Sequence, residues 1–197
     1  MKKALKYFLI ILGLSFQKPL FPQDLVLKIG DPAPELNFYE LGTPEKMVSW
    51  QDYENQIIIL DFWATWCPPC IEAIPHLNKL VEEFEDRPVK FISITYEPPH
   101  MLTSFLKKHP MKSTVAIDND FAMFTSYKAW GIPMIAVIDR NQTIASMIHP
   151  TQLTAAVIED ALAGEPLTVE QAKGWPDPEG AEEYFRSLVK KAEEKSE

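Results

Sequence analysis

Asp61-Phe62-Trp63-Ala64-Thr65-Trp66-Cys67-Pro68-Pro69-Cys70 is the stretch that decides the fold, and it contains the only two cysteines among 197 residues. It overlaps the end of Gln56–Phe62, which is apolar almost throughout, as expected of a strand buried on both faces. From Ile71 onward, apolar residues recur at helical spacing as far as Phe84. A C-x-x-C pair between a buried strand and an amphipathic helix is typical of a redox-active dithiol. The sequence therefore predicts thiol–disulfide exchange.

The positions of the two cysteines predict different roles for them. Cys67 falls at the N-cap of the expected helix and Pro68 at its first position, where a missing N–H is tolerated. Unpaired N–H groups and the helix dipole stabilise an anion there, so we expect Cys67 to be the nucleophile. Pro69 removes a second N–H, which predicts only a moderately lowered pKa for Cys67 and favours a reductant or mild exchanger. Cys70, one turn further in and less accessible, is the predicted resolving thiol.

The same residues resemble a known family. Trp66-Cys67-Pro68-Pro69-Cys70, preceded by Phe62-Trp63-Ala64-Thr65, is similar to the thioredoxin superfamily, most closely its exported TlpA/ResA-type thiol–disulfide oxidoreductases. The resemblance runs from about Ile29 to Gly164, and its further matches are Gly30-Asp31-Pro32-Ala33-Pro34, Pro75 and Gly131-Ile132-Pro133. It implies an α/β fold, a thioredoxin-like three-layer α/β/α sandwich with a central mixed sheet. An N-terminal extension and an inserted helix and strand within Val89–Thr114 are implied as well.

The resemblance also implies a substrate-binding groove. In the family, the proline that matches Pro133 is cis and lies against the disulfide, here Cys67–Cys70. The backbone of the preceding residue, here Ile132, pairs with an extended substrate. Trp66 is expected at the rim of this groove.

Asp61, six residues before Cys67, falls where cytoplasmic thioredoxins keep a buried aspartate and many exported relatives have asparagine. A carboxylate buried beside the dithiol would have a raised pKa and could accept the Cys70 proton during resolution. We therefore expect Asp61 to be the proton acceptor. The alternative is a strand residue that merely faces solvent.

The cysteine pair also fits other kinds of site. A zinc site would need more ligands, and no further cysteine is present; His76, His100, His109 and His149 show no ligand spacing with the pair. A purely structural disulfide closing so small a loop would stabilise little. Two alternatives stay open: a thiol-dependent peroxidase of the redoxin group, although no Pro-x-x-x-Thr-type pocket precedes Cys67, and a non-enzymatic thioredoxin-like binding or chaperone module. No cofactor and no metal is expected.

The net charge and the N-terminal sequence indicate which partners and which location to expect. A formal net charge of −9 disfavours nucleic acid, and no phosphate-binding loop appears among seven glycines. Lysines precede the apolar run Tyr7–Leu14, which is too short to span a bilayer comfortably, so residues 1–22 are interpreted as an export signal or, if uncleaved, a membrane anchor. Export would place the protein in the periplasm or on the outer face of a bacterial cytoplasmic membrane. There it would act on protein disulfides and need a membrane-bound electron donor.

The rest of the chain predicts alternating strands and helices. Strands are expected at Val89–Thr95, Thr114–Ile117 and, as an antiparallel hairpin, Met134–Asp139 and Thr143–Ile148. Helices are expected at Met101–His109, Asn119–Trp130 and Thr151–Ala163, the last ending at Gly164. The extent of the resemblance implies a thioredoxin-like domain at 29–164, which these elements fill. Residues 165–197 are interpreted as a polar C-terminal extension that is partly helical, with a final helix capped near Asp177.

Overall fold

The computed structural model describes residues 27–43, 46–118 and 120–165. The strands are β1 Phe38–Glu40, β2 Met47–Val48, β3 Ile57–Phe62, β4 Val89–Thr95, β5 Thr114–Ile117, β6 Met134–Ile138 and β7 Ile144–Ile148. The helices are α1 Pro68–Glu83, α2 Pro99–Leu106, α3 Ala122–Ser126 and α4 Ala155–Ala163, with 3-10 turns η1 Trp50–Tyr53 and η2 Pro150–Gln152. The export signal predicted for residues 1–22 and, except for Glu165, the extension predicted for residues 165–197 lie outside the described residues.

The strands form one mixed sheet in the order β2-β1-β5-β4-β3-β6-β7. β3 is central and pairs in parallel with β4 and antiparallel with β6. β5 continues the parallel part, whereas β6 and β7 form the predicted antiparallel hairpin. All six residues of β3 are buried, which confirms the double-sided burial that its apolar sequence predicts.

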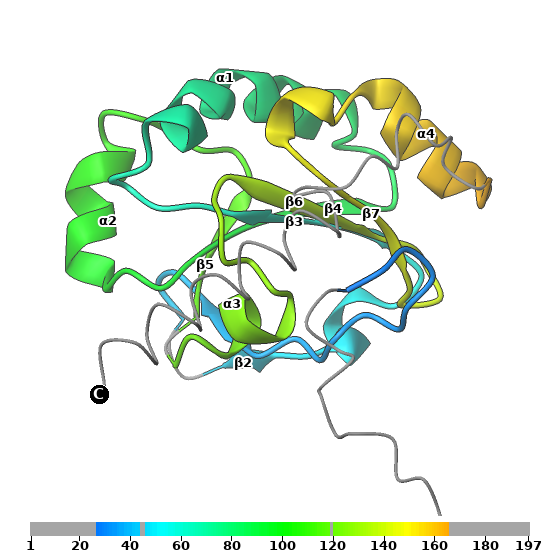
Figure 1. Cartoon of the computed structure of the whole chain (residues 1–197). Helices are drawn as coiled ribbons and strands as arrows, with labels where there is room; N and C mark the ends of the chain where they lie inside the picture. The colour runs from blue at the N-terminus through cyan, green and yellow to red at the C-terminus, as the bar shows by residue number, and fades with distance from the viewer. Residues whose placement is uncertain (1–26, 44–45, 119, 166–197) are drawn as a thin grey trace, which may run out of the picture.

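Helices cover both faces of the sheet. α1 and α4 lie on one face, and α3 lies on the other (Figure 1). Because side chains alternate along β3, Ile57 and Ile59 pack with α1 and α4, whereas Leu60 and Phe62 pack with α3. This arrangement is the predicted three-layer α/β/α sandwich with a mixed sheet.

The predicted insertion Val89–Thr114 contains β4, α2 and the first residue of β5. β4 pairs with β3 from Val89 to Ile94, so it belongs to the centre of the sheet. α2 contributes Leu102 to a separate cluster with Trp63 and the two cysteines. The helix of this segment therefore packs beside the C-x-x-C turn, whereas its strand β4 belongs to the sheet.

Three predicted helices differ in extent. The helix predicted at Asn119–Trp130 is only Ala122–Ser126, because Phe121 and Lys128 both adopt left-handed backbone conformations, with φ of 62° and 56°. The helix predicted at Thr151–Ala163 starts at Ala155, after a 3-10 turn, where the Thr154 hydroxyl accepts a hydrogen bond from the Val157 amide.

The third helix, predicted at Met101–His109, is displaced toward the N-terminus, since α2 begins at Pro99. A proline is well tolerated in a first helical turn, so the Pro98-Pro99 pair starts this helix instead of preceding it.

Candidate active site

The two cysteines form a disulfide at the N-terminus of α1. Cys67 is the N-cap and Pro68 the first helical residue, as the sequence predicts, and the Cα atoms of Cys67 and Cys70 are 5.3 Å apart. The Cys70 amide donates a hydrogen bond to Cys67 Sγ at 3.3 Å. The two residues are 3% and 4% exposed, so accessibility in the disulfide form does not distinguish them. Their difference is one of helix position, because Cys67 Sγ receives the N-terminal amide.

The surroundings of the disulfide are apolar. Cys67 and Cys70 belong to a buried cluster with Trp63 and Leu102, and Ile132 packs against the edge of that cluster. The Ile132–Pro133 peptide bond is cis, the isomer that the resemblance implies, and Pro133 is buried. The fold thus brings Ile132, more than sixty positions further along the chain, to the cluster that holds the cysteines.

Asp61 is a buried carboxyl on the face of β3 that α1 covers. It is 5% exposed and follows Ile57 and Ile59 on the same side of the strand. On this face, Ala73 and Leu77 of α1 pack in one cluster with Ile57 and Ile59 of β3. Burial raises the pKa of Asp61 from 3.8 to about 7, and the hydrogen bond that the Ser93 hydroxyl donates to Oδ2 at 2.9 Å opposes that rise. Such a group exchanges protons near neutral pH.

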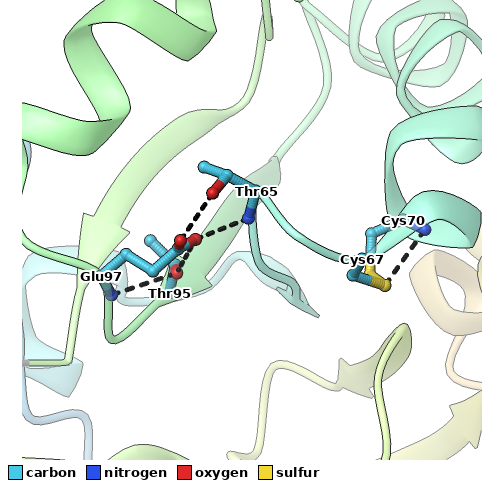
Figure 2. Close-up of a disulfide and its surroundings, with 5 residues drawn as sticks. All are labelled: Thr65, Cys67, Cys70, Thr95 and Glu97. Atoms are coloured by element: carbon cyan, nitrogen blue, oxygen red, sulfur yellow. Dashed lines mark hydrogen bonds between the residues drawn. A yellow bond between two sulfur atoms is a disulfide. The ribbon is translucent and has the colours of Figure 1, made fainter.

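A second buried carboxylate, Glu97, holds the loop in front of the disulfide (Figure 2). The Thr65 amide donates to Glu97 Oε2 at 2.5 Å and the Thr65 hydroxyl donates to Oε1 at 2.6 Å. The Thr95 hydroxyl donates to Oε2 at 3.3 Å. Glu97 is 4% exposed, so these bonds form in a nearly dry environment. They tie the chain two residues before Cys67 to the C-terminal end of β4.

Sequence analysis missed Glu97, although a signal was present. Glu97 comes two residues after a buried strand that runs parallel to the strand before the cysteines. Carboxyl ends of neighbouring parallel strands meet at one edge of a sheet, which is where polar groups of a site gather. Tyr96-Glu97-Pro98-Pro99 has the composition of an ordinary exposed loop, so the sequence alone gives Glu97 no sign of burial.

Exposed aromatic side chains lie near the same edge. Trp66, directly before Cys67, is 61% exposed. Tyr96 is next to Glu97 in the chain and contacts Phe121, with ring centroids 5.1 Å apart; these two residues are 37% and 38% exposed. Large apolar groups at such exposure can bind an apolar partner.

Two curated proteins with similar sequences are named thiol-disulfide oxidoreductase ResA. The chain is 26% identical over 141 residues to the thiol-disulfide oxidoreductase ResA of Bacillus thuringiensis subsp. konkukian, which covers 71% of this chain and 80% of that protein. It is 24% identical over 144 residues to the ResA protein of Geobacillus kaustophilus, covering 73% and 82% respectively.

Solved structures agree on the fold. A candidate thiol:disulfide interchange protein DsbE from Chlorobium tepidum superposes with a TM-score of 0.62 at 27% identity, covering 69% of this chain and 99% of that one. A thioredoxin family protein of Chlorobium tepidum TLS, 21% identical with a TM-score of 0.55, covers 68% and 97% and supports the fold alone. A family model described as AhpC/TSA family matches residues 29–147.

Proposed function

The chain belongs to the AhpC/TSA family, and within it we propose that this protein is an exported thiol–disulfide oxidoreductase that exchanges disulfides with protein substrates. The observation that carries the proposal is the Cys67–Cys70 disulfide at the N-terminus of α1, with the Cys70 amide directed at Cys67 Sγ. The similarity to ResA proteins and to a DsbE-type structure supports the same activity.

In the proposed reaction the reduced protein attacks a substrate disulfide. The Cys67 thiolate forms a bond to one substrate sulfur, and the other substrate sulfur leaves with the electron pair of the broken S–S bond. The helix N-terminus stabilises the attacking anion, and the Cys70 amide donates to it. The apolar cluster around the cysteines keeps water from the reacting sulfurs.

Resolution then releases the bound substrate. Cys70 loses its proton to the Asp61 carboxylate and attacks Cys67 Sγ, so that the Cys67–Cys70 bond forms and the substrate departs as a thiolate. Asp61 suits this step because it is buried on the face of β3 that α1 covers and its pKa is raised to about 7. The carboxyl is thus able to take up a proton under the conditions in which the thiol must lose one.

Protein substrates are favoured by the apolar surroundings of the disulfide. Trp66 is exposed beside the nucleophile, and Ile132 packs at the edge of the cysteine cluster. An extended substrate segment lying along Ile132 would place its disulfide near Cys67 and its apolar side chains near Trp66.

The proposal includes where the protein is located and where its electrons come from. The lysines and short apolar run near the N-terminus support export. In the part of the chain that the structure describes, no helix combines the length and the apolar character needed to cross a bilayer. A reductase in an oxidising compartment requires an electron donor, for which a membrane-bound protein is proposed.

Two assays on one purified sample test the proposal. The reduced protein should accelerate insulin reduction by dithiothreitol, and Cys67→Ser should abolish that acceleration. Consumption of hydrogen peroxide with turnover, without insulin reduction, would instead establish the thiol-dependent peroxidase. Inactivity in both assays, with binding of unfolded proteins retained in Cys67→Ser, would favour the binding or chaperone module.

A further inference from the structure

Two serine hydroxyls continue from Asp61 toward the surface. Ser93 is the partner of Asp61 across the β3–β4 pair and is 1% exposed. Its Oγ donates to Asp61 Oδ2 at 2.9 Å and lies 2.8 Å from the Oγ of Ser113, where either hydroxyl can be the donor. Ser113 is only partly buried and directly precedes β5. Three side chains from three segments thus form one continuous hydrogen-bonded row.

The row ends at a pocket. Ser113 lines a surface pocket of about 430 Å³ that opens beside the C-terminal end of α1, whereas the cysteines lie at the N-terminal end of that helix. Charged side chains surround its mouth: Glu82 and Lys112, which form an ion pair, and also Glu85 and Lys90. A pocket of this size and polarity accommodates water.

We propose that Ser93 and Ser113 are positioning residues that form a proton relay between Asp61 and the water of this pocket. The inference rests on the proposed function, because it concerns the proton that Cys70 gives up during resolution. In the relay, the Asp61 acid donates to Ser93 Oγ, Ser93 passes its own proton to Ser113 Oγ, and Ser113 passes one to pocket water. One proton leaves, no electron moves, and rotation of both hydroxyls restores the starting arrangement.

Because Asp61 is buried, its proton needs a route to solvent that does not pass the cysteines. While a substrate is joined to Cys67, it covers the disulfide side, and Asp61 is itself only 5% exposed. Across the sheet, Asp61 pairs with Ser93 of β4 and Ile135 of β6. The buried residues of α1, which covers this face, are Cys70, Ala73, Ile74, Leu77 and Leu80, so none of these partners among the described residues is charged. A proton on Asp61 therefore has no charged neighbour to receive it, whereas the Ser93 hydroxyl is already in hydrogen-bond contact.

Ser113→Ala interrupts the relay without touching Asp61, and Ser113→Thr keeps the hydroxyl. The matched control is Ser126→Ala, which removes a hydroxyl that donates to Met123 on the opposite face of the sheet. In the oxidised protein, a pH jump from 6 to 8 should convert the Asp61 acid to the carboxylate. Time-resolved infrared absorption measures the rate of this conversion. The Asp61 band is identified by its loss in Asp61→Asn. We expect Ser113→Ala to slow this deprotonation about tenfold, below the ~10²-fold typical of losing a positioned base, because Asp61 remains.

The outcomes separate the relay from the activity. In Ser113→Thr and Ser126→Ala, Asp61 should lose its proton at the wild-type rate. The fraction of Asp61 that is still protonated at the end should be the same in these two variants and in Ser113→Ala. Resolution of a Cys67–peptide mixed disulfide should slow in Ser113→Ala alone, with the rate of Cys67 attack unchanged. A wild-type deprotonation rate in Ser113→Ala would overturn the relay while leaving the oxidoreductase intact. If the wild type reduces no disulfide, the proposed function fails, yet the infrared experiment still decides whether the relay exists.

Ser93→Ala provides an independent variant. It removes the middle hydroxyl and also the donor that lowers the pKa of Asp61, so that pKa should rise further. Slow deprotonation together with a raised pKa is expected. A raised pKa with a wild-type rate would contradict the relay, because it would leave Ser93 only an electrostatic role.

Discussion

Asp61→Asn should remove a pH dependence from the stability of the oxidised protein. Burial raises the pKa of Asp61 from 3.8 to about 7 in the folded protein, whereas the unfolded chain keeps the ordinary value. Between these two values the folded protein holds a proton that the unfolded chain has lost. The free energy of unfolding must therefore fall as pH rises through this window. Below it the carboxyl is neutral in both states, and above it the carboxylate is charged in both.

The magnitude follows from the same two values. Each pKa unit corresponds to about 1.4 kcal/mol, so the difference between 3.8 and about 7 corresponds to about 4 kcal/mol. Asparagine cannot ionise. The free energy of unfolding of Asp61→Asn, relative to that of the wild type, should therefore rise by about 4 kcal/mol between pH 4 and pH 8. That change is large beside the total stability of a typical domain.

Guanidinium chloride unfolding of both oxidised proteins, followed by tryptophan fluorescence at half-unit steps from pH 3 to pH 9, measures the difference. Asp52→Asn is a control of opposite sign, since hydrogen bonds from Lys46 and Ser49 lower the pKa of Asp52. Relative to that variant, the wild type should lose stability as pH falls through the acidic range. Parallel curves for the wild type and Asp61→Asn from pH 4 to pH 8 would refute the reasoning, since a buried carboxyl with a raised pKa cannot produce them.

Four kinetic and stability experiments address the other site residues. Cys70→Ser should trap a mixed disulfide with substrate through Cys67, as seen on non-reducing gels, and Cys67→Ser should trap none; the reverse pattern would exchange their roles. Asp61→Asn should slow release of a mixed disulfide about 10²-fold at pH 7 with little effect on Cys67 alkylation, and equal release rates from pH 6 to 8 would reduce Asp61 to a packing residue. Glu97→Ala leaves buried donors unpaired and should lower the free energy of unfolding by about 1–3 kcal/mol in urea titrations, while an unchanged midpoint would mean the loop is held by other contacts. Trp66→Ala should preserve the melting temperature and the reduction of a small aromatic disulfide but lower kcat/KM for insulin several-fold; equal losses for both substrates would place Trp66 in the chemistry instead.

Much of the fold could be predicted because burial leaves a clear pattern. Ile57–Phe62 is apolar except for Asp61, and Val89–Thr95 is mainly apolar, since the central strands are covered on both faces; that pattern is local. The N-cap position of Cys67 was predictable for a similar reason, because Pro68 and the apolar spacing after Ile71 mark a helix start. The mixed sheet and the three layers followed from the resemblance that these residues carry.

What could not be predicted depends on contacts distant in the chain. β1 and β2 contain only three and two residues, too few to show an alternation of apolar and polar side chains. They are strands because β1 pairs with β5 and with β2. The bond between Glu97 and Thr65 joins residues 32 positions apart, and the Ser93–Ser113 contact depends on the register of β4 and β5. Left-handed Phe121 is a further case, because a bulky residue gives no local sign of that conformation.

The central place of β3 also determines which part of the molecule senses the redox state. Its backbone is hydrogen-bonded on both sides, to β4 and to β6, and both of its faces are covered. Amides in such a strand exchange with solvent only when the whole domain unfolds, whereas loop amides exchange through small local openings. Reduction of the disulfide should accordingly alter deuterium uptake between Trp63 and Cys70 and leave the protection pattern of β3 unchanged. The cysteine pair is thus oxidised and reduced at the end of a strand whose hydrogen bonds stay intact in both redox states.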